Sequence, residues 1–283
     1  MREFIRHAAG ITVVTGAILL ATLLPFLPGQ HDTMSAPASL MARVFGLTGL
    51  MLVPIGAVWV ASAHSKSLAA KQHLIAIAAL AVASFVWFSV LLGAVATSGA
   101  VLGLGGFLLW TCVVVAMVPR LRRLRALPLR SVHPVAFYLL VVPAAVAALQ
   151  MVVVAPAIEF SRNRAIRNSA ALIADIEQYR AANGRYPESL MSVHEDYHPG
   201  LLGIQGYRYE PKGEAYNLFF EQATLHFGVR EFVMYNPFDQ HAMTSHKLDR
   251  VQLTPAQLAL DQTRGHNALH DTAHPHWKYF WFD

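Results

Sequence analysis

Five uninterrupted apolar runs are the feature that most constrains how this chain folds. Each run is long enough to cross roughly 30 Å of hydrocarbon, which takes about 20 helical residues, and none contains an ionisable Asp, Glu, Lys, Arg or His. Because a backbone in lipid must satisfy its own hydrogen bonds, we expect transmembrane helices rather than open strands. The predicted spans are Ala8–Leu27, Val44–Ala63, Leu74–Ala96, Gly99–Val118 and Val135–Ala157.

Composition and charge agree with a membrane protein that carries a separate polar part. The chain is 55% hydrophobic and only 14% charged, which is outside the usual range for a soluble domain. Residues 1–157 have a net charge of +8 and residues 158–283 a net charge of −3. The basic excess lies in short loops between apolar runs, so it predicts no nucleic-acid partner. We therefore expect a transmembrane region over 1–157, with the lipid bilayer as its partner, and a second domain over 158–283.

The positions of the cations predict the orientation, because cytoplasmic loops retain Lys and Arg. The opposite loops offer only Arg43, balanced by Asp32, and the uncharged pair Thr97-Ser98. We expect a multi-pass protein of the inner (plasma) membrane with a cytoplasmic amino terminus and an extracytoplasmic carboxyl-terminal domain. Three arginines count against this orientation because they follow the fifth run: Arg162, Arg164 and Arg167. The cations on the predicted cytoplasmic side are Arg2, Arg6, Lys66, Lys71, Arg120, Arg122, Arg123, Arg125 and Arg130.

The first run has an alternative interpretation as a cleaved signal peptide. Arg2 and Arg6 precede an apolar segment, and Ala36-Pro37-Ala38 resembles a cleavage site. Cleavage there would leave the orientation of the remaining spans unchanged. The single cysteine, Cys112, lies inside an apolar run and excludes an intrachain disulfide.

Polar groups within the spans are sparse, which argues against an ion or proton pathway. Such pathways usually need ionisable side chains facing the bundle interior. Gln150 is the strongest polar group in any span, and we expect it to hydrogen-bond between helices. Trp59, Trp87 and Trp110 are expected to face lipid or the membrane interface.

After the fifth run the apolar character stops but the helical period continues. A narrow, mostly apolar stripe predicts that the helix continues as an amphipathic stem. Asn183-Gly184 predicts a left-handed end to this stem, and Pro187 prevents its continuation. The stripe consists of Ala165, Ser169, Leu172, Ile176 and Tyr179.

Beyond the stem the period changes to two. Tyr207–Tyr209 and Tyr216–Phe220 flank the turn Pro211–Glu214, a pattern that indicates a β-hairpin with a core of aromatic side chains against the stem. Glu231–Tyr235 predicts a third strand, after which Asn236-Pro237-Phe238-Asp239 fixes a turn. A capping box at Thr254 predicts a short helix to about Arg264, and Trp277–Phe282 a final strand.

Three features together resemble type IV pilins and type II secretion pseudopilins. They are a long helix, membrane-embedded in its first half and amphipathic in its second, then the string YRAANGRYPESL, then the aromatic hairpin GYRYEPKGEAYNLFF. The resemblance covers about residues 135–235, and its most specific part is Arg185-Tyr186-Pro187 after Asn183-Gly184. Four other spans precede this region, and Glu159 lies at the end of the fifth. The resemblance therefore implies a pilin-like domain tethered to a helical bundle.

Histidines in the carboxyl-terminal segment suggest a different chemistry. Neutral imidazoles with a carboxylate suit zinc or copper, and the string GHNALHDTAHPHW holds the candidate metal ligands. The alternative is a solvated loop before the last strand. Ser, His and Asp occur, but no strained nucleophile turn or Gly-rich phosphate loop marks a catalytic set, so a non-enzymatic role is favoured. The candidate ligands are His266, His270, Asp271, His274 and His276.

The sequence thus predicts a membrane all-α bundle of five transmembrane helices, plus a C-terminal α+β pilin-like domain with a long stem helix and a small antiparallel sheet. The predicted function is a scaffold or interaction module in the cell envelope, with another envelope protein as its partner. The alternative is an envelope metal-binding or sensing protein that uses the histidine-rich segment.

Overall fold

The computed structural model describes residues 2–62, 64, 71–98, 100–124, 133–193, 197–224, 229–241 and 269–282. These residues are mostly helical, with one small antiparallel sheet. The chain divides into two compact units. Unit 1 comprises Met1–Leu24 and Met34–Val154, and unit 2 comprises Pro25–Thr33 and Ala155–Asp283. The predicted domain boundary at 157/158 lies close to the second division, whereas the sequence did not indicate that Pro25–Thr33 belongs to unit 2.

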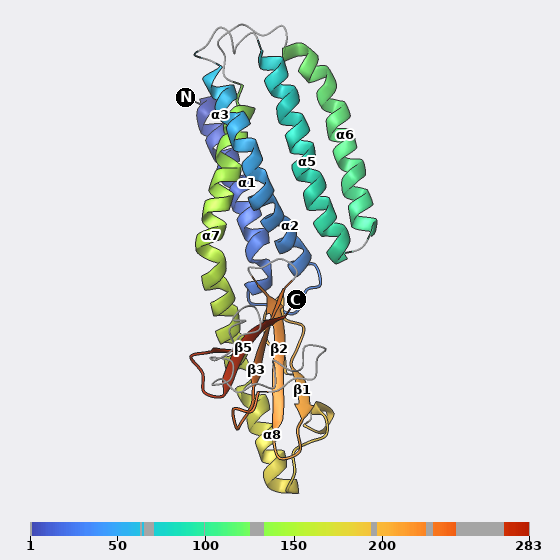
Figure 1. Cartoon of the computed structure of the whole chain (residues 1–283), viewed down its shortest axis with the longest axis vertical. Helices are drawn as coiled ribbons and strands as arrows, with labels where there is room; N and C mark the ends of the chain where they lie inside the picture. The colour runs from blue at the N-terminus through green and yellow to red at the C-terminus, as the bar shows by residue number, and fades with distance from the viewer. Residues whose placement is uncertain are drawn as a thin grey trace, which may run out of the picture. The chain divides into compact units, whose positions relative to one another are not determined.

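Unit 1 is a bundle of apolar helices (Figure 1). Among the described residues, four helical stretches are long and apolar enough to cross a membrane: Ile5–Phe26, Ser35–Ala61, Gln72–Val95 and Val135–Asn183. The fourth predicted span, Gly99–Val118, forms helix α6, but the apolar stretch found among its described residues, Gly103–Met117, is shorter than a full span. Its elements are α1 (Arg2–Leu23), α2 (Ser35–Thr48), η2 (Gly49–Leu52), α3 (Val53–Ala61), α5 (Gln72–Ser98), α6 (Ala100–Leu124) and the first part of α7 (Val135–Asn168). The short helix η1 (Leu24–Phe26) includes the boundary between the two units in the chain.

Two helices begin earlier than the apolar runs predicted. Helix α1 begins at Arg2 rather than Ala8, and α2 begins at Ser35 rather than Val44. The prediction stopped at ionisable residues such as Arg43, but a single charge does not end a helix. Pro37 lies in the first turn of α2, where proline is tolerated because the backbone N–H has no intrahelical partner there. The Ala36-Pro37-Ala38 string is therefore helical in this structure.

Gln150 joins three helices of unit 1, as predicted. Its Nε2 donates to Thr22 Oγ1 on α1 at 2.8 Å and to the Ala42 carbonyl oxygen on α2 at 3.0 Å. Gly46 makes room for this amide, because a β-carbon at that position would collide with the Gln150 side chain. The interhelical role expected for the amide is confirmed.

Trp59 corrects the expectation that the tryptophans of the spans face lipid or the interface. It is 4% exposed and packs with Ala76, Ala79 and Ala136. One helical turn before it, Gly56 lets α3 approach α7, since a β-carbon at Gly56 would lie only 2.8 Å from the Leu140 backbone nitrogen. Small residues at this contact bring the backbones close enough for the indole to be enclosed.

The stem of unit 2 follows the predicted pattern. Helix α7 is followed by α8 (Ala170–Asn183), and Gly184 ends α8 with a φ of 73°, a left-handed conformation that glycine adopts without a steric cost. Of the predicted stripe, Ala165, Ser169, Leu172 and Ile176 are at most 1% exposed. The stripe is therefore the buried face of the stem.

The sheet of unit 2 has five antiparallel strands in the order β1-β2-β3-β5-β4. The predicted hairpin, third strand and final strand are confirmed, and the predicted helix near Thr254–Arg264 lies outside the described residues. The short strand β4 was not predicted. The strands are β1 (Arg208–Pro211), β2 (Tyr216–Ala223), β3 (Arg230–Tyr235), β4 (His270–Asp271) and β5 (Trp277–Phe282).

Both faces of this sheet bury apolar side chains. Tyr216, Leu218 and Phe220 of β2 are fully buried in the cluster that includes the stem residues Leu172 and Ile176. The alternate positions form a second cluster on the opposite face, made of Phe219, Met234 and Phe280 with Phe232 and Leu269 packed against it. The hairpin aromatics thus form core, as expected, but on two faces rather than one.

A loop from the start of the chain pairs with the segment that precedes β1. Gly29 N donates to the Gly200 carbonyl oxygen at 3.1 Å, and Leu202 N donates to the Leu27 carbonyl oxygen at 3.0 Å. Pro28 and Leu201 form an isolated antiparallel bridge. Gly203 is needed here, because a β-carbon would lie 2.6 Å from the Pro25 carbonyl oxygen. The loop Pro25–Thr33 is therefore an integral part of unit 2.

A buried carboxylate, that of Glu231, holds the stem against the sheet. It accepts hydrogen bonds from Arg162 Nε at 2.7 Å and Arg162 Nη2 at 2.9 Å, both from the stem. Its strand neighbours contribute two more, Gln222 Nε2 at 2.8 Å and Trp281 Nε1 at 3.2 Å. Ser161 in turn donates to Gln222 Oε1 at 2.8 Å. The side chain of Glu231 is 2% exposed, so its charge depends on these donors.

Replacing Glu231 by alanine should destabilise unit 2 by about 3–5 kcal/mol, because Arg162 is left as a buried, unpaired cation. The measurement is urea unfolding of the full-length protein in detergent, followed by near-ultraviolet circular dichroism. The control is Glu188→Ala, which removes a solvent-exposed Arg185–Glu188 pair and should cost less than about 1 kcal/mol. Equal losses in the two variants would contradict the role assigned to Glu231.

Candidate functional site

The first wall of the candidate site is the turn after β3. Asn236 Oδ1 accepts hydrogen bonds from the backbone nitrogens of Phe238 and Gln240, each at 3.0 Å. Its Nδ2 donates to the Tyr216 carbonyl oxygen at 3.2 Å and to Asn217 Oδ1 at 2.9 Å. Both ends of the amide are thus used to fix the turn, which confirms the structural role predicted for this segment.

The second wall is the turn between β4 and β5. Thr272 Oγ1 lies 2.9 Å from the Trp277 carbonyl oxygen and accepts a hydrogen bond from His274 N at 3.1 Å. The carbonyl oxygen of His276 accepts a hydrogen bond from Asn236 N at 3.1 Å, so the two turns are tied together. His241 Nε2 lies 3.1 Å from the same oxygen and donates to it in the tautomer protonated at that nitrogen.

Between these turns lies a polar pocket of about 370 Å³. A hydrogen-bond contact and an ion pair line it: His276 Nδ1 is 3.2 Å from Asp239 Oδ2, and Lys278 Nζ is 3.1 Å from Asp271 Oδ1. The pocket thus offers two carboxylates, an imidazole and an ammonium group, an arrangement suited to a polar group of a ligand or partner. Its lining residues are Asp239, Asp271, Thr272, Ala273, His274, Pro275, His276, Trp277 and Lys278.

Backbone conformation sets this pocket apart within the described part of the chain. Asp239 has a φ of 59° and His276 a φ of 65°, and these are the only non-glycine residues with positive φ there. Residues held in this region cost free energy and gather at functional sites. The two strained residues contact each other, so the strain is concentrated at a single point of the pocket wall.

The predicted metal ligands are divided by the structure. Asp271, His274 and His276 line the polar pocket, whereas His266 lies outside the described residues. Among the residues described, no group of three or more His, Cys, Asp or Glu side chains is arranged to hold a metal ion. A zinc or copper site that includes His266 stays a prediction. Asp239 and Lys278 are pocket residues that the sequence did not mark as candidates. The string Asn236-Pro237-Phe238-Asp239 was interpreted as a turn, and Lys278 lies within the predicted final strand.

His270 belongs to a different environment. It lies on β4, and its ring stacks on Tyr279 with centroids 5.0 Å apart and contacts Trp281 at 4.8 Å. The guanidinium carbon of Arg162 lies over the same Tyr279 ring, 3.7 Å from its centroid. Burial lowers the pKa of His270, outweighing the nearby Glu231 carboxylate that favours the charged form. A neutral, stacked imidazole is a packing residue here.

Comparisons with protein-family models, with curated proteins and with solved structures gave no match to this chain. The functional argument for this protein therefore depends on its own residues and their geometry.

The stability of unit 2 should fall as the pH drops below about 6.5, the pKa of an unperturbed histidine. Burial lowers the pKa of both His241 and His270 in the folded state, so the unfolded state takes up protons first on acidification. The unfolding temperature of the full-length protein, measured between pH 7.5 and 5, checks this.

The control is the double variant His241→Gln and His270→Gln, whose unfolding temperature should depend less steeply on pH over that range. An unchanged slope in the double variant would assign the acid sensitivity to other groups.

Proposed function

We propose that this protein crosses the inner membrane five times and presents unit 2 outside the cytoplasm as a scaffold or interaction module of the cell envelope. The observation that carries the proposal is the backbone pairing between the loop Pro25–Thr33 and the segment around Gly200–Gly203. That loop follows α1, and the second segment follows the stem. Paired backbones must share one side of a membrane, so α1 and α7 end on the same side.

This shared side favours five spans over four. If α1, α2–α3, α5, α6 and α7 each cross once, α1 and α7 run in the same direction and both end on the side of unit 2. If α6 did not cross, α7 would run opposite to α1 and the paired segments would be separated by the bilayer. Helix α6 has 25 residues, long enough for a span at 1.5 Å per residue. The pairing thus supports a membrane-crossing α6.

The cations then decide which side is cytoplasmic. In the five-span arrangement, α1 and α7 end on one side, and the amino end and the segments after α3 and α6 fall on the other. These segments carry most of the Lys and Arg of residues 1–157. Arg162 counts less against this orientation than its position suggested, because its charge is paired with Glu231 inside unit 2. The orientation with a cytoplasmic amino terminus and an extracytoplasmic unit 2 is therefore favoured.

The pilin-like part of the proposal has support from the stem and the sheet. A long helix, apolar in its first half, buries one stripe of its second half under an antiparallel sheet, which is the arrangement that the resemblance implies. In unit 2, Phe238 is 51% exposed and immediately precedes Asp239 of the polar pocket. An exposed aromatic beside paired charges has the chemistry of a protein interface.

Cysteine labelling tests the topology, and the single native cysteine makes a clean background after Cys112→Ser. Gln30→Cys in the loop and Arg185→Cys after the stem should both react with a membrane-impermeant maleimide in intact cells stripped of their outer barrier. His64→Cys, after α3, should react only once the membrane is permeabilised. Labelling of Gln30→Cys and Arg185→Cys from opposite sides would exclude the five-span arrangement.

Phe238→Ser should remove the binding of an envelope partner while leaving the fold intact, because the side chain is exposed and contributes little to the core. The measurement is chemical crosslinking in membranes followed by purification of the full-length protein. Met191→Ser is the matched control, since Met191 is 91% exposed in the same unit but lies apart from the pocket lining. A crosslinked partner retained by Phe238→Ser would exclude this face as the interaction surface.

A further inference from the structure

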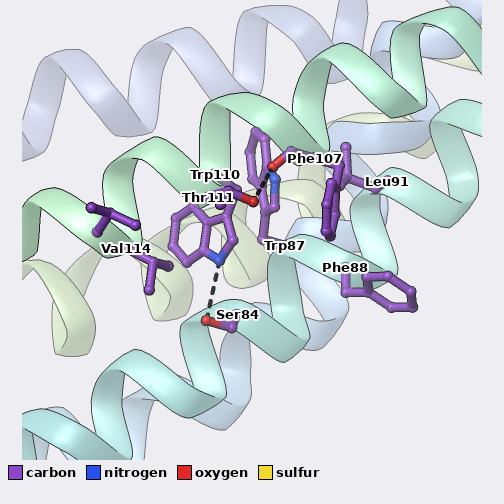
Figure 2. Close-up of a pocket in the computed structure, with 9 residues that line it drawn as sticks. Ser84, Trp87, Phe88, Leu91, Phe107, Trp110, Thr111 and Val114 are labelled. Carbon is purple, nitrogen blue, oxygen red and sulfur yellow. Dashed lines mark hydrogen bonds between the residues drawn. The ribbon is translucent and has the colours of Figure 1, made fainter.

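A groove lies between α5 and α6, within unit 1. It encloses about 260 Å³ and is lined almost entirely by apolar and aromatic side chains. Figure 2 shows Trp87 and Trp110 side by side at its centre, where their rings stack with centroids 5.6 Å apart. The lining residues are Ser84, Trp87, Phe88, Leu91, Phe107, Trp110, Thr111, Val114 and Val115.

Glycines on α6 explain why the groove opens where it does. A β-carbon at Gly103 would collide with Val95, and one at Gly106 would collide with Leu91, so α6 approaches α5 closely at these positions. The indole of Trp87, on α5, and that of Trp110, on α6, lie between the two helices. The glycines therefore allow a close approach of α6 to α5, and the aromatic pair lies beside this contact.

The polar groups in the groove are already hydrogen-bonded within the two helices. Trp110 Nε1 donates to Ser84 Oγ at 3.1 Å, and Ser84 Oγ donates to the Leu80 carbonyl oxygen at 2.8 Å. Trp87 Nε1 donates to the Gly106 carbonyl oxygen at 3.3 Å. Thr111 Oγ1 donates to the carbonyl oxygen of Phe107 at 2.9 Å, as Figure 2 shows. With these donors used, the groove presents an apolar surface that suits a hydrocarbon chain.

The surroundings of the groove are apolar as well, which points to lipid. Helix α6 packs extensively only against α5 within the described residues. Side chains of α6 at the rim and outside are about half exposed or more, including Phe107 at 50% and Val115 at 64%. On a helix that crosses a membrane, these side chains contact acyl chains.

Beyond the groove, α6 becomes basic. Arg120, Arg122 and Arg123 occupy its last two turns, and Arg122 follows Val115 by seven residues, a rise of about 10 Å. Position 122 lies seven residues after Val115 and eleven residues after Thr111. Both spacings are close to whole numbers of helical turns, so position 122 shares the helix face of these two residues. Position 120, nine residues after Thr111, is on the opposite face. The helix period therefore places an arginine at a position on the groove face of α6.

We propose that the α5–α6 groove holds an acyl chain of an anionic phospholipid whose headgroup is bound at the basic end of α6, with Arg122 as the cation on the groove face. Such a lipid matches both parts of the site: the hydrocarbon enters the apolar groove, and the phosphate lies among the arginines near the surface. A zwitterionic phospholipid has the same chains but lacks the net charge, so it fills the groove without a headgroup preference.

Quenching of tryptophan fluorescence by brominated lipids tests the proposal with the full-length protein in nanodiscs. Trp87 and Trp110 line the groove, whereas Trp59 is buried and Trp277 and Trp281 belong to unit 2. Phosphatidylglycerol with brominated chains should quench more than phosphatidylcholine with the same chains at an equal mole fraction. The double variant Trp87→Phe and Trp110→Phe should lose this excess.

Charge variants supply the matched comparison. Arg122→Gln should raise the mole fraction of brominated phosphatidylglycerol needed for half-maximal excess quenching by about fivefold, since one cation near the surface is worth about a factor of this size. Arg120→Gln, on the opposite face, should change it much less. Equal quenching by the two lipids, equal effects of the two arginine variants, or an excess that survives loss of both tryptophans would each overturn the proposal. Absence of quenching by either lipid, as expected if a protein helix fills the groove, would overturn it too.

Discussion

The buried carboxylate of Glu231 is the interaction on which the second unit depends most. At 2% exposure it is stable as an anion only if several donors surround it, and it has four from three elements. Gln222 and Trp281 are its direct cross-strand neighbours in the registers of β2–β3 and β3–β5. A slip of one residue in either pairing would turn these donors to the other face of the sheet. The same carboxylate therefore constrains strand register and the position of the stem.

A second constraint acts through the loop Pro25–Thr33. Its backbone groups pair with the segment before β1, so the beginning and the end of the chain are joined in one unit. Phe26 of η1 is 1% exposed, and Gly203 leaves the space in which the two backbones meet. In a protein that crosses a membrane, such a contact restricts the number of crossings between its two partners. The backbone pairing thus limits the number of membrane crossings between its two segments, and the number of crossings decides the compartment in which the polar pocket lies.

Much of the fold follows from local sequence patterns. The helical period of the stem, the left-handed stop at Gly184, the alternation of Tyr216–Phe220 and the turn at Asn236 were all predicted, because each depends on residues a few positions apart. Apolar runs located the helices of unit 1 but misplaced two of their beginnings, since hydropathy reports burial in lipid and not helix formation. Trp59 was misassigned for a related reason: an indole looks alike in sequence whether it contacts lipid or the bundle interior.

The candidate site required the tertiary structure. Histidines 274 and 276 were singled out by their density in the sequence, but their neighbour Asp239 comes from a turn more than 30 residues earlier, and only the pairing of β3 with β5 brings it to the pocket. By itself the sequence determined that the chain contains two kinds of segment, long uncharged helices compatible with lipid and a charged tail suited to water, because composition and period are local properties. The partners of Glu231, Pro28 and Asp239 were decided by the tertiary structure, because contacts between distant residues depend on strand register and helix packing that no local pattern records.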